Sequence, residues 1–257
     1  MTLFLKHIEN ETGRIYYRVN GEEHGNTIVM VHGLAGDSRF FHTQMKYFSS
    51  RYRMISIDLP GHGRSAEYPD LSLESFNSCI NEVIKHENPD KYILIGHSMG
   101  GCICLEHYRN NRDRILSMIL VSTAAVLPVD SGLINNARNN FTEFFDGFLG
   151  LIFSKKAGIF ILAAKTSITE AEQNVIINDL EICSTMNYES VLPEIDIPVL
   201  LLANRDDMMV PCVLTERMHS KIRNSEFIVF DEKGHIPFFE AHEKFNAAVK
   251  EFLKARL

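Results

Sequence analysis

The sequence is short of the features that mark nucleic-acid-binding, membrane-spanning and secreted proteins. No run of lysine and arginine stands out and the formal net charge is -7, so the positive charge needed to neutralise nucleic-acid phosphates is missing. No apolar run is long enough to span a bilayer. Residues 1–10 are apolar only up to Leu5, which predicts a strand and not a signal peptide.

Cysteine and metal-ligand patterns are also sparse. The five cysteines show no framework spacing and no C-x-x-C pair: Cys79, Cys102, Cys104, Cys183 and Cys212. Free thiols in a reducing compartment are the simplest interpretation, and we expect a cytoplasmic protein with no membrane span. No group of histidines, cysteines or carboxylates has metal-ligand spacing, so we expect neither a metal nor a cofactor.

Apolar strand-like runs alternate with amphipathic helical segments along most of the 257 residues. This rhythm predicts an α/β fold with a mostly parallel, doubly wound sheet that has helices on both faces. An antiparallel hairpin is expected first, at residues 3–8 and 14–19, followed by strands at 27–31, 53–57, 92–95, 115–121, 199–203 and 227–230. Helices are expected within 37–48, at 72–87, after 211 and at 239–256.

The stretch between residues 122 and 191 breaks this alternation. It carries no strand signal, but it contains helical periodicity at 135–148, 149–166 and 169–183. We therefore predict an α/β core at 1–121 and 192–257, with a small helical cap at 122–191 above one edge of the sheet.

The most specific motif is Gly96-His97-Ser98-Met99-Gly100, which matches G-x-S-x-G. An apolar strand precedes it and a helical segment follows it, the arrangement of a nucleophile elbow. Small residues two positions before and after Ser98 let the strand and helix approach, and the strained turn exposes the serine oxygen. The backbone amide of Met99, at the helix N-terminus, is expected to stabilise an oxyanion.

A nucleophilic serine needs a base that a third group orients. In this type of fold the chain order is serine, acid, histidine. Asp206 and Asp207 follow the strand at 199–203, and His235 follows the next strand. Parallel strands place their carboxyl ends at one edge of the sheet, so these side chains are expected to meet.

The chain resembles the α/β-hydrolase family at these motifs. Beyond the elbow, the resemblance rests on His32-Gly33, on the segment 58–65 (DLPGHGRS), on 207–211 and on 234–237 (GHIP). It implies a Ser98, Asp207 and His235 triad, with the backbone amide of Leu34 as the second oxyanion donor. The family pattern G-x-x-D-x-x-x-P selects Asp207 over Asp206. Here Asn204 replaces the glycine, and we expect it to adopt the left-handed backbone that asparagine tolerates.

Other polar residues near the strand ends have structural interpretations. We expect His32 and His62 to organise loops through hydrogen bonds, and Asp58 to support the Gly61–Gly63 turn. His97 is expected to flank the substrate pocket or to pack beside it. Apolar residues of the cap are more often core than ligand contacts, yet the phenylalanines at 141–148 occupy more than one helical face. We therefore predict an apolar substrate pocket roofed by Phe141, Phe144, Phe145 and Phe148.

The predicted function is a serine hydrolase that cleaves a small or medium apolar carboxylic ester. Carbon–carbon bond hydrolases share the triad but often use a pocket tryptophan, and this sequence has none. A methyl esterase for substrates on an acyl carrier protein, and a cofactor-free haloperoxidase, stay open, although their relatives often have an aromatic residue at the position of His97. Ser98 excludes chemistries that need an aspartate nucleophile. The alternative from another class is a binding protein that kept the fold without the catalysis.

Overall fold

The computed structural model describes residues 4–65, 71–153 and 169–256, and it confirms the α/β fold. An eight-stranded sheet has the strand order β1-β2-β4-β3-β5-β6-β7-β8. The β1–β2 and β2–β4 pairs are antiparallel, and the pairs from β4–β3 to β7–β8 are parallel. The strands are β1 (Phe4–Asn10), β2 (Gly13–Asn20), β3 (Thr27–Val31), β4 (Arg53–Ile57), β5 (Tyr92–His97), β6 (Ile115–Val121), β7 (Val199–Asp206) and β8 (Ser225–Lys233).

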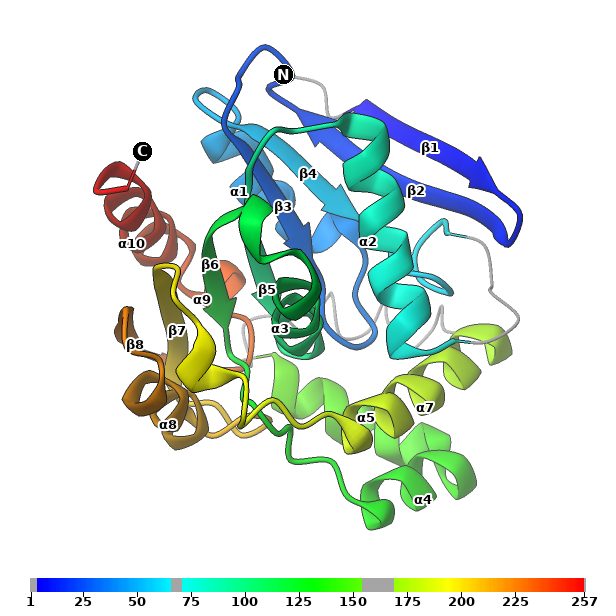
Figure 1. Ribbon diagram of the computed structural model, residues 1–257. Helices are drawn as coiled ribbons and strands as arrows, with labels where there is room; N and C mark the ends of the chain where they lie inside the picture. The colour runs from blue at the N-terminus through cyan, green and yellow to red at the C-terminus, as the bar shows by residue number, and fades with distance from the viewer. Residues whose placement is uncertain (1–3, 66–70, 154–168, 257) are drawn as a thin grey trace.

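Helices cover both faces of this sheet. On one face α2, α3 and α8 pack over a core that includes Phe76, Leu105 and Met218, and on the other α1 and α10 bury Met45 and Phe245 (Figure 1). Because both faces are covered, β3 and β5 are buried along their whole length. These helices are α1 (His42–Phe48), α2 (Leu73–Glu87), α3 (Met99–Asn111), α8 (Cys212–Lys221) and α10 (His242–Lys254).

Local capping explains where several helices begin and end. Ser72 and Ser75 form a reciprocal capping box at the start of α2, although serine replaces the usual glutamate. Asn88 ends that helix with a left-handed φ of 45°. Asp37 accepts a hydrogen bond from the Arg39 amide and begins a single 3-10 turn, Ser38–Phe41, so α1 itself starts later than expected.

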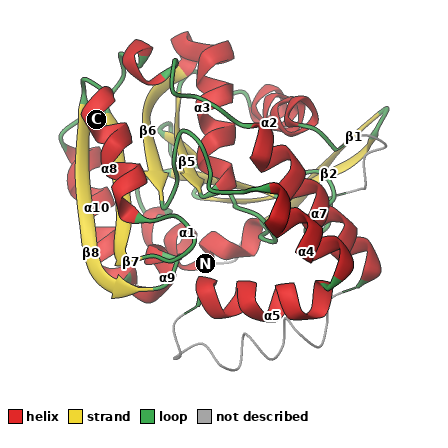
Figure 2. Cartoon of the chain, turned by 90° about the horizontal axis from the view of Figure 1, so that it is seen from below, coloured by secondary structure: helices red, strands yellow, loops and turns green. Residues whose placement is uncertain are grey.

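The cap helices α4 (Ser131–Asn139), α5 (Phe141–Ile152) and α7 (Glu170–Thr185) lie beyond the carboxyl ends of the central strands. Figure 2, which is seen from below, shows α4 beside α7 and next to α5. The expected continuous helix at 135–148 is wrong, because the chain breaks at Asn140 with φ -138° and ψ 50°. Asparagines at 139 and 140 favour such a break, since their side chains compete for backbone hydrogen bonds. Most of the helix expected at 149–166 lies outside the described residues.

Further boundaries also differ from the sequence-based expectation. The strand that was expected to end at Ala203 continues to Asp206. The single helix expected at 239–256 is instead α9 (Pro237–Glu240) followed by α10, with a break at Ala241, where φ is -130°. The break lets Phe238 pack against Phe41, while α10 lies along the sheet and buries Phe245.

Candidate active site

Ser98 lies at a strained turn between β5 and α3. Its φ of 53° and ψ of -120° are outside the regions that side-chain-bearing residues normally occupy. The flanking glycines make this turn sterically feasible: a Cβ atom on Gly96 would lie 2.5 Å from the Gly100 carbonyl oxygen, and one on Gly100 would lie 2.3 Å from that of Val31. The Ser98 amide donates to the Val121 carbonyl oxygen at 2.9 Å. This hydrogen bond anchors the turn to β6, the neighbour of β5 in the sheet.

His235 and Asp207 meet at the same edge of the sheet. His235 Nδ1 lies 2.8 Å from Asp207 Oδ2, and both side chains are buried. The other carboxylate oxygen, Oδ1, accepts from the Met209 amide at 2.9 Å and from the Val210 amide at 3.0 Å. The carboxylate is thus fixed on both sides. The neighbouring Asp206 is exposed at the end of β7 and makes no contact of this kind among the residues that the structure describes.

Asn204 supports this arrangement in a way that differs from the expectation. It lies within β7 and is not among the residues with positive φ, so the predicted left-handed turn is wrong. Its buried side chain instead donates from Nδ2 to the Gly234 carbonyl oxygen at 2.8 Å. Gly234 needs its φ of 98°, which favours glycine. The amide side chain therefore ties the His235 loop to the strand that precedes Asp207.

His97 holds the same loop from the opposite side. Its Nε2 atom lies 3.0 Å from the His235 carbonyl oxygen, which can only accept, so the proton is on Nε2. Burial, together with the nearby His235 ring, lowers the pKa of His97 well below its ordinary value. His97 is therefore a neutral residue that positions the loop while it lines the small cavity beside Ser98.

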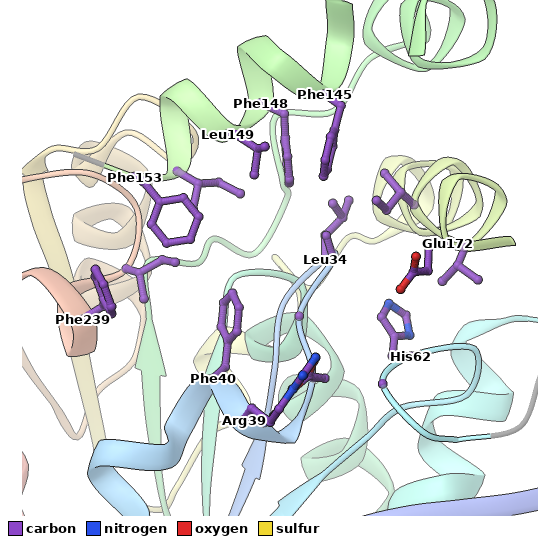
Figure 3. A pocket seen from close by; sticks show the side chains of 18 of the residues that line it. Leu34, Arg39, Phe40, His62, Phe145, Phe148, Leu149, Phe153, Glu172 and Phe239 are labelled. Carbon is purple, nitrogen blue, oxygen red and sulfur yellow. The ribbon is translucent and has the colours of Figure 1, made fainter. Parts of the chain in front are cut away.

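Two cavities with common walls lie at this edge of the sheet. Ser98, Met99, His97 and His235 line a small cavity of about 60 Å³, together with residues of the cap. A larger cavity of about 560 Å³ lies beneath α5 and beside α7 (Figure 3). Both cavities share the side chains of Leu34, Phe40, Phe148, Ile152 and Ile236.

The cap phenylalanines divide into two groups, of which only one faces these cavities. Phe145 and Phe148 point from α5 into the larger cavity (Figure 3), and Phe148 also lines the smaller one. Phe141 and Phe144 line neither cavity, so their assignment to the pocket is wrong. They pack behind the wall: Phe141 stacks on Phe145 with a centroid separation of 5.4 Å, and Phe144 stacks on Phe148 at 5.7 Å.

Leu34 and Met99 line the small cavity together with Ser98. Met99 is the first residue of α3, and its side chain is fully buried. Leu34 follows the Gly33 that packs against Ser98, where an added Cβ atom would lie 3.0 Å from the Ser98 Cβ atom. The tight turn after Leu34 uses a left-handed Ala35, with φ 58°. This places the backbone of both segments beside the serine.

Asp58, in the loop after β4, and His32, at the end of β3, make the structural contacts that the sequence predicts. Asp58 accepts from the Ser38 amide at 2.7 Å and from the Arg64 amide at 3.0 Å. A Cβ atom on Gly63 would lie 2.6 Å from the Asp58 carboxyl carbon. His32 receives a hydrogen bond at Nε2 from the Leu59 amide, at 3.2 Å. These contacts shape the loop that carries His62.

The sequence reasoning missed Asp179, which contacts His62 from the cap. His62 Nε2 lies 2.8 Å from Asp179 Oδ2, and both side chains are buried. Asp179 is 117 positions away from His62 and lies on a helix that periodicity assigned only to the cap. An acidic residue on the buried side of an amphipathic helix was the one signal that could have indicated a partner in the core.

Within the described ranges, no helix combines the length and apolar character that crossing a membrane requires. In the same ranges, no group of at least three histidine, cysteine or carboxylate side chains gathers where it could hold a metal ion.

Comparison with known families is decisive at the level of the fold. The sequence profile described as alpha/beta hydrolase fold matches residues 26–173, which is more than half of the chain. The chain belongs to the α/β-hydrolase fold family. A second profile, described as TAP-like protein, matches residues 172–255.

Individual relatives are distant but match over nearly their full length. The pimeloyl-[acyl-carrier protein] methyl ester esterase of Aliivibrio fischeri is 24% identical over 94% of this chain and 98% of that protein. The enzyme of the same name from Nitrosomonas europaea is 26% identical over 86% of this chain and 93% of its own. Among solved structures, an esterase from Exiguobacterium antarcticum superposes with a TM-score of 0.84 at 24% identity, covering 97% of this chain and 99% of that one. An enol-lactonase from Burkholderia xenovorans gives a TM-score of 0.88 at 20% identity, covering 97% and 100%.

Proposed function

We propose that this α/β hydrolase is a serine esterase that cleaves carboxylic esters through an acyl-enzyme, with Ser98, His235 and Asp207 as its triad. The observation that carries the proposal is the 2.8 Å contact between His235 Nδ1 and an Asp207 carboxylate that two backbone amides hold in place. We also propose that the core (1–121 and 192–257) supplies the chemistry and that the cap (122–191) shapes the substrate pocket.

The proton positions follow from this contact. Because the Asp207 carboxylate accepts the proton of Nδ1, the Nε2 atom of neutral His235 is left with a free lone pair. In the mechanism, Nε2 takes the proton of the Ser98 hydroxyl as Oγ attacks the ester carbonyl carbon. The same proton is then given to the alcohol that leaves. A water molecule repeats the sequence on the acyl-enzyme and releases the acid.

The tetrahedral intermediate carries a negative oxygen that needs fixed hydrogen-bond donors. The backbone amides of Leu34 and Met99 are the proposed donors, since Met99 begins α3 and Leu34 lies beside Ser98 on the facing loop. Loss of one such donor in other hydrolases costs about 10²–10³ in kcat. Side-chain substitution at either position leaves the amide in place, so its effect on kcat is expected to be small.

The experiment that tests this function compares wild type with Ser98→Ala on p-nitrophenyl esters from acetate to decanoate. We expect activity that peaks at one chain length and disappears in the variant, and labelling of Ser98 by an organophosphonate. Labelling without ester hydrolysis would favour carbon–carbon bond hydrolysis or another specialised substrate. Neither activity nor labelling would favour a binding protein and overturn the proposal.

A methyl ester on an acyl carrier protein is the second candidate substrate, and the names of the relatives from Aliivibrio fischeri and Nitrosomonas europaea favour it. The acyl carrier protein would then be a partner of this chain. The test measures the loss of the methyl group by mass spectrometry, for a methyl ester bound to the carrier and for the same methyl ester free of the carrier. A kcat/KM that is no higher for the carrier-bound ester would remove the carrier from the proposal.

A further inference from the structure

His62 and Asp179 form a buried polar contact between the core and the cap. His62 lies on the loop after β4, and its ring lines the larger cavity (Figure 3). Asp179 lies on α7, whose residues Val175 and Ile176 line the same cavity and whose residue Leu180 lines the smaller one. Whatever holds α7 on this loop therefore shapes both cavities.

The two ring nitrogens of His62 both face oxygen atoms that accept hydrogen bonds. Nδ1 lies 2.9 Å from the Pro60 carbonyl oxygen, and Nε2 lies 2.8 Å from the Asp179 carboxylate. A neutral imidazole has one N–H group, so it satisfies one of these contacts and leaves the other as lone pair against lone pair. Both contacts are favourable when the pair holds one additional proton. This holds whichever of the two groups carries that proton.

The neighbouring His32 shows the opposite pattern. Its Nδ1 atom contacts the Gly33 carbonyl oxygen at 2.8 Å, while its Nε2 atom accepts from the Leu59 amide, so a neutral ring satisfies both. Burial and the nearby His62 lower the pKa of His32 to about 3. The two rings lie 4.9 Å apart, yet their surroundings require different protonation.

Asp179 is a buried carboxylate whose second oxygen atom makes no hydrogen bond, so the contact with His62 is its only compensation among the described residues. Asp179 is 0% exposed, and its Oδ1 atom has no hydrogen-bond partner among the described residues. A buried carboxylate without its partner is strongly unfavourable, and the alternative to keeping the contact is to move the helix toward water. Close packing leaves little intermediate room, since a Cβ atom on Gly61 would lie 3.1 Å from Val175 Cγ2.

We propose that the His62–Asp179 contact is a proton-dependent latch that seats α7 over the substrate cavities and so controls substrate binding. It is a positioning device and not part of the triad, and its effect on the reaction rests on the proposed esterase function. The other titratable groups around it in the described part of the chain are Asp58 and His32 on the His62 side, Cys183 on the Asp179 side, and Glu172 of α7, which lies near the His62 ring in the wall of the larger cavity (Figure 3).

The sign of the pH dependence follows from the pair. Burial is the largest influence and lowers the pKa of His62, but the Asp179 carboxylate, the Pro60 carbonyl and Asp58 together outweigh it, so the net shift of the pKa is upward from the ordinary value of 6.5. A group whose pKa is raised in the folded protein contributes stability below its unfolded pKa and loses it as pH rises through the folded value. The latch is therefore closed below the ordinary pKa of 6.5, and it opens as the pH rises through the raised pKa of the folded protein.

The test measures KM and kcat for a medium-chain ester from about pH 6 to about pH 9. In wild type we expect KM to rise about fivefold or more through the transition, because the binding-competent cap is less populated. The proposed base also makes kcat depend on pH, so the pH profile of kcat should be the same in wild type and in Asp179→Asn. Hydrogen exchange of the α7 amides, corrected for intrinsic rates, should increase over the same interval. A flat KM together with unchanged exchange would overturn the proposal.

Three variants separate the latch from general destabilisation. Asp179→Asn can donate its amide to a neutral His62, so the contact survives without the extra proton and the pH dependence of KM should vanish. Asp179→Ala should raise KM at every pH. Glu181→Gln, on the same helix, breaks an ion pair with Arg138 inside the cap and should keep the wild-type profile. A transition that persists in Asp179→Asn would refute the latch.

NMR titration of His62 tests the latch without a measurement of catalysis. In NMR spectra of wild type, with the His62 signals assigned by their loss in His62→Gln, we expect two ring N–H groups at about pH 6. A single ring N–H group at that pH, together with a ¹³C shift that shows an ionised Asp179 carboxyl, would show that the pair lacks the extra proton. Activity that survives in Ser98→Ala would instead refute the esterase mechanism and leave this titration unaffected.

Discussion

His97, the residue before the elbow serine, lies with Nε2 3.0 Å from the main-chain carbonyl oxygen of His235. The two rings are 4.7 Å apart. Asp207 holds the side chain of His235 and His97 holds its backbone, so the proposed base is fixed at two points. Through His97, the elbow therefore positions His235 as well as Ser98.

His97→Ala is expected to lower kcat/KM by about 10–100-fold, because a small displacement of a catalytic group is costly and the His235 carbonyl loses its donor. His97→Gln keeps an N–H donor of similar reach and should retain most of the activity. Ester kinetics and thermal unfolding of both variants check this. Equal losses in the two variants would show that the ring matters for packing and not for the hydrogen bond.

Asp207→Asn is expected to lower kcat by about 10³–10⁴-fold, because an amide can present a donor to Nδ1 and stabilise the wrong tautomer of His235. The matched control is Asp206→Asn, whose side chain is exposed one residue earlier. That variant should keep kcat within about twofold of wild type. If the larger loss follows Asp206 instead, the family pattern has assigned the acid to the wrong carboxylate.

Predictions succeeded where local chemistry dictates local structure. The strained turn at Ser98 needs small neighbours, and Gly96 and Gly100 supply them in sequence. Parallel strands bring their carboxyl ends to one edge, which is why Asp207 and His235, far from Ser98 in the chain, could be assigned to the same site. The Ser72–Ser75 capping box is likewise a local feature.

Predictions failed where the deciding contact comes from a distant segment. Asn204 was expected to replace a turn glycine, but it lies within β7 and its side chain donates a hydrogen bond to the Gly234 carbonyl oxygen. Phe144 and Phe145 are adjacent in sequence and equally apolar, yet only Phe145 lines the larger cavity, because the direction of α5 over the core decides which face is the roof. The role of Asp179 depends on its contact with His62, which is 117 positions away in the sequence. Periodicity carries no information about such packing.

Gly100→Ala is expected to destabilise the protein by about 3 kcal/mol or more, because overpacking forces backbones apart and the added Cβ atom would lie 2.3 Å from the Val31 carbonyl oxygen. Gly147→Ala is the control, since its Cβ atom would meet nothing within 4 Å on the exposed face of α5. That change should stabilise by about 0.5–1 kcal/mol through helix propensity. Urea unfolding of both variants measures the difference. A stable Gly100→Ala protein would contradict the close approach at the elbow.

Phe145→Asp is expected to raise KM for medium-chain esters by at least about tenfold, because it places a charge in the apolar wall of the larger cavity. Leu151→Asp is the matched control: it lies on the same helix, but its side chain is 41% exposed. Both KM values should be measured at a temperature where thermal unfolding shows each variant to be folded.

A KM that rises equally in both variants would point to a general effect of charge on α5. An unchanged KM for Phe145→Asp would mean that the acyl or alkyl chain does not bind under this helix. A rise confined to Phe145 would place the substrate chain in the cavity between α5 and the loop that carries Leu34 and Phe40.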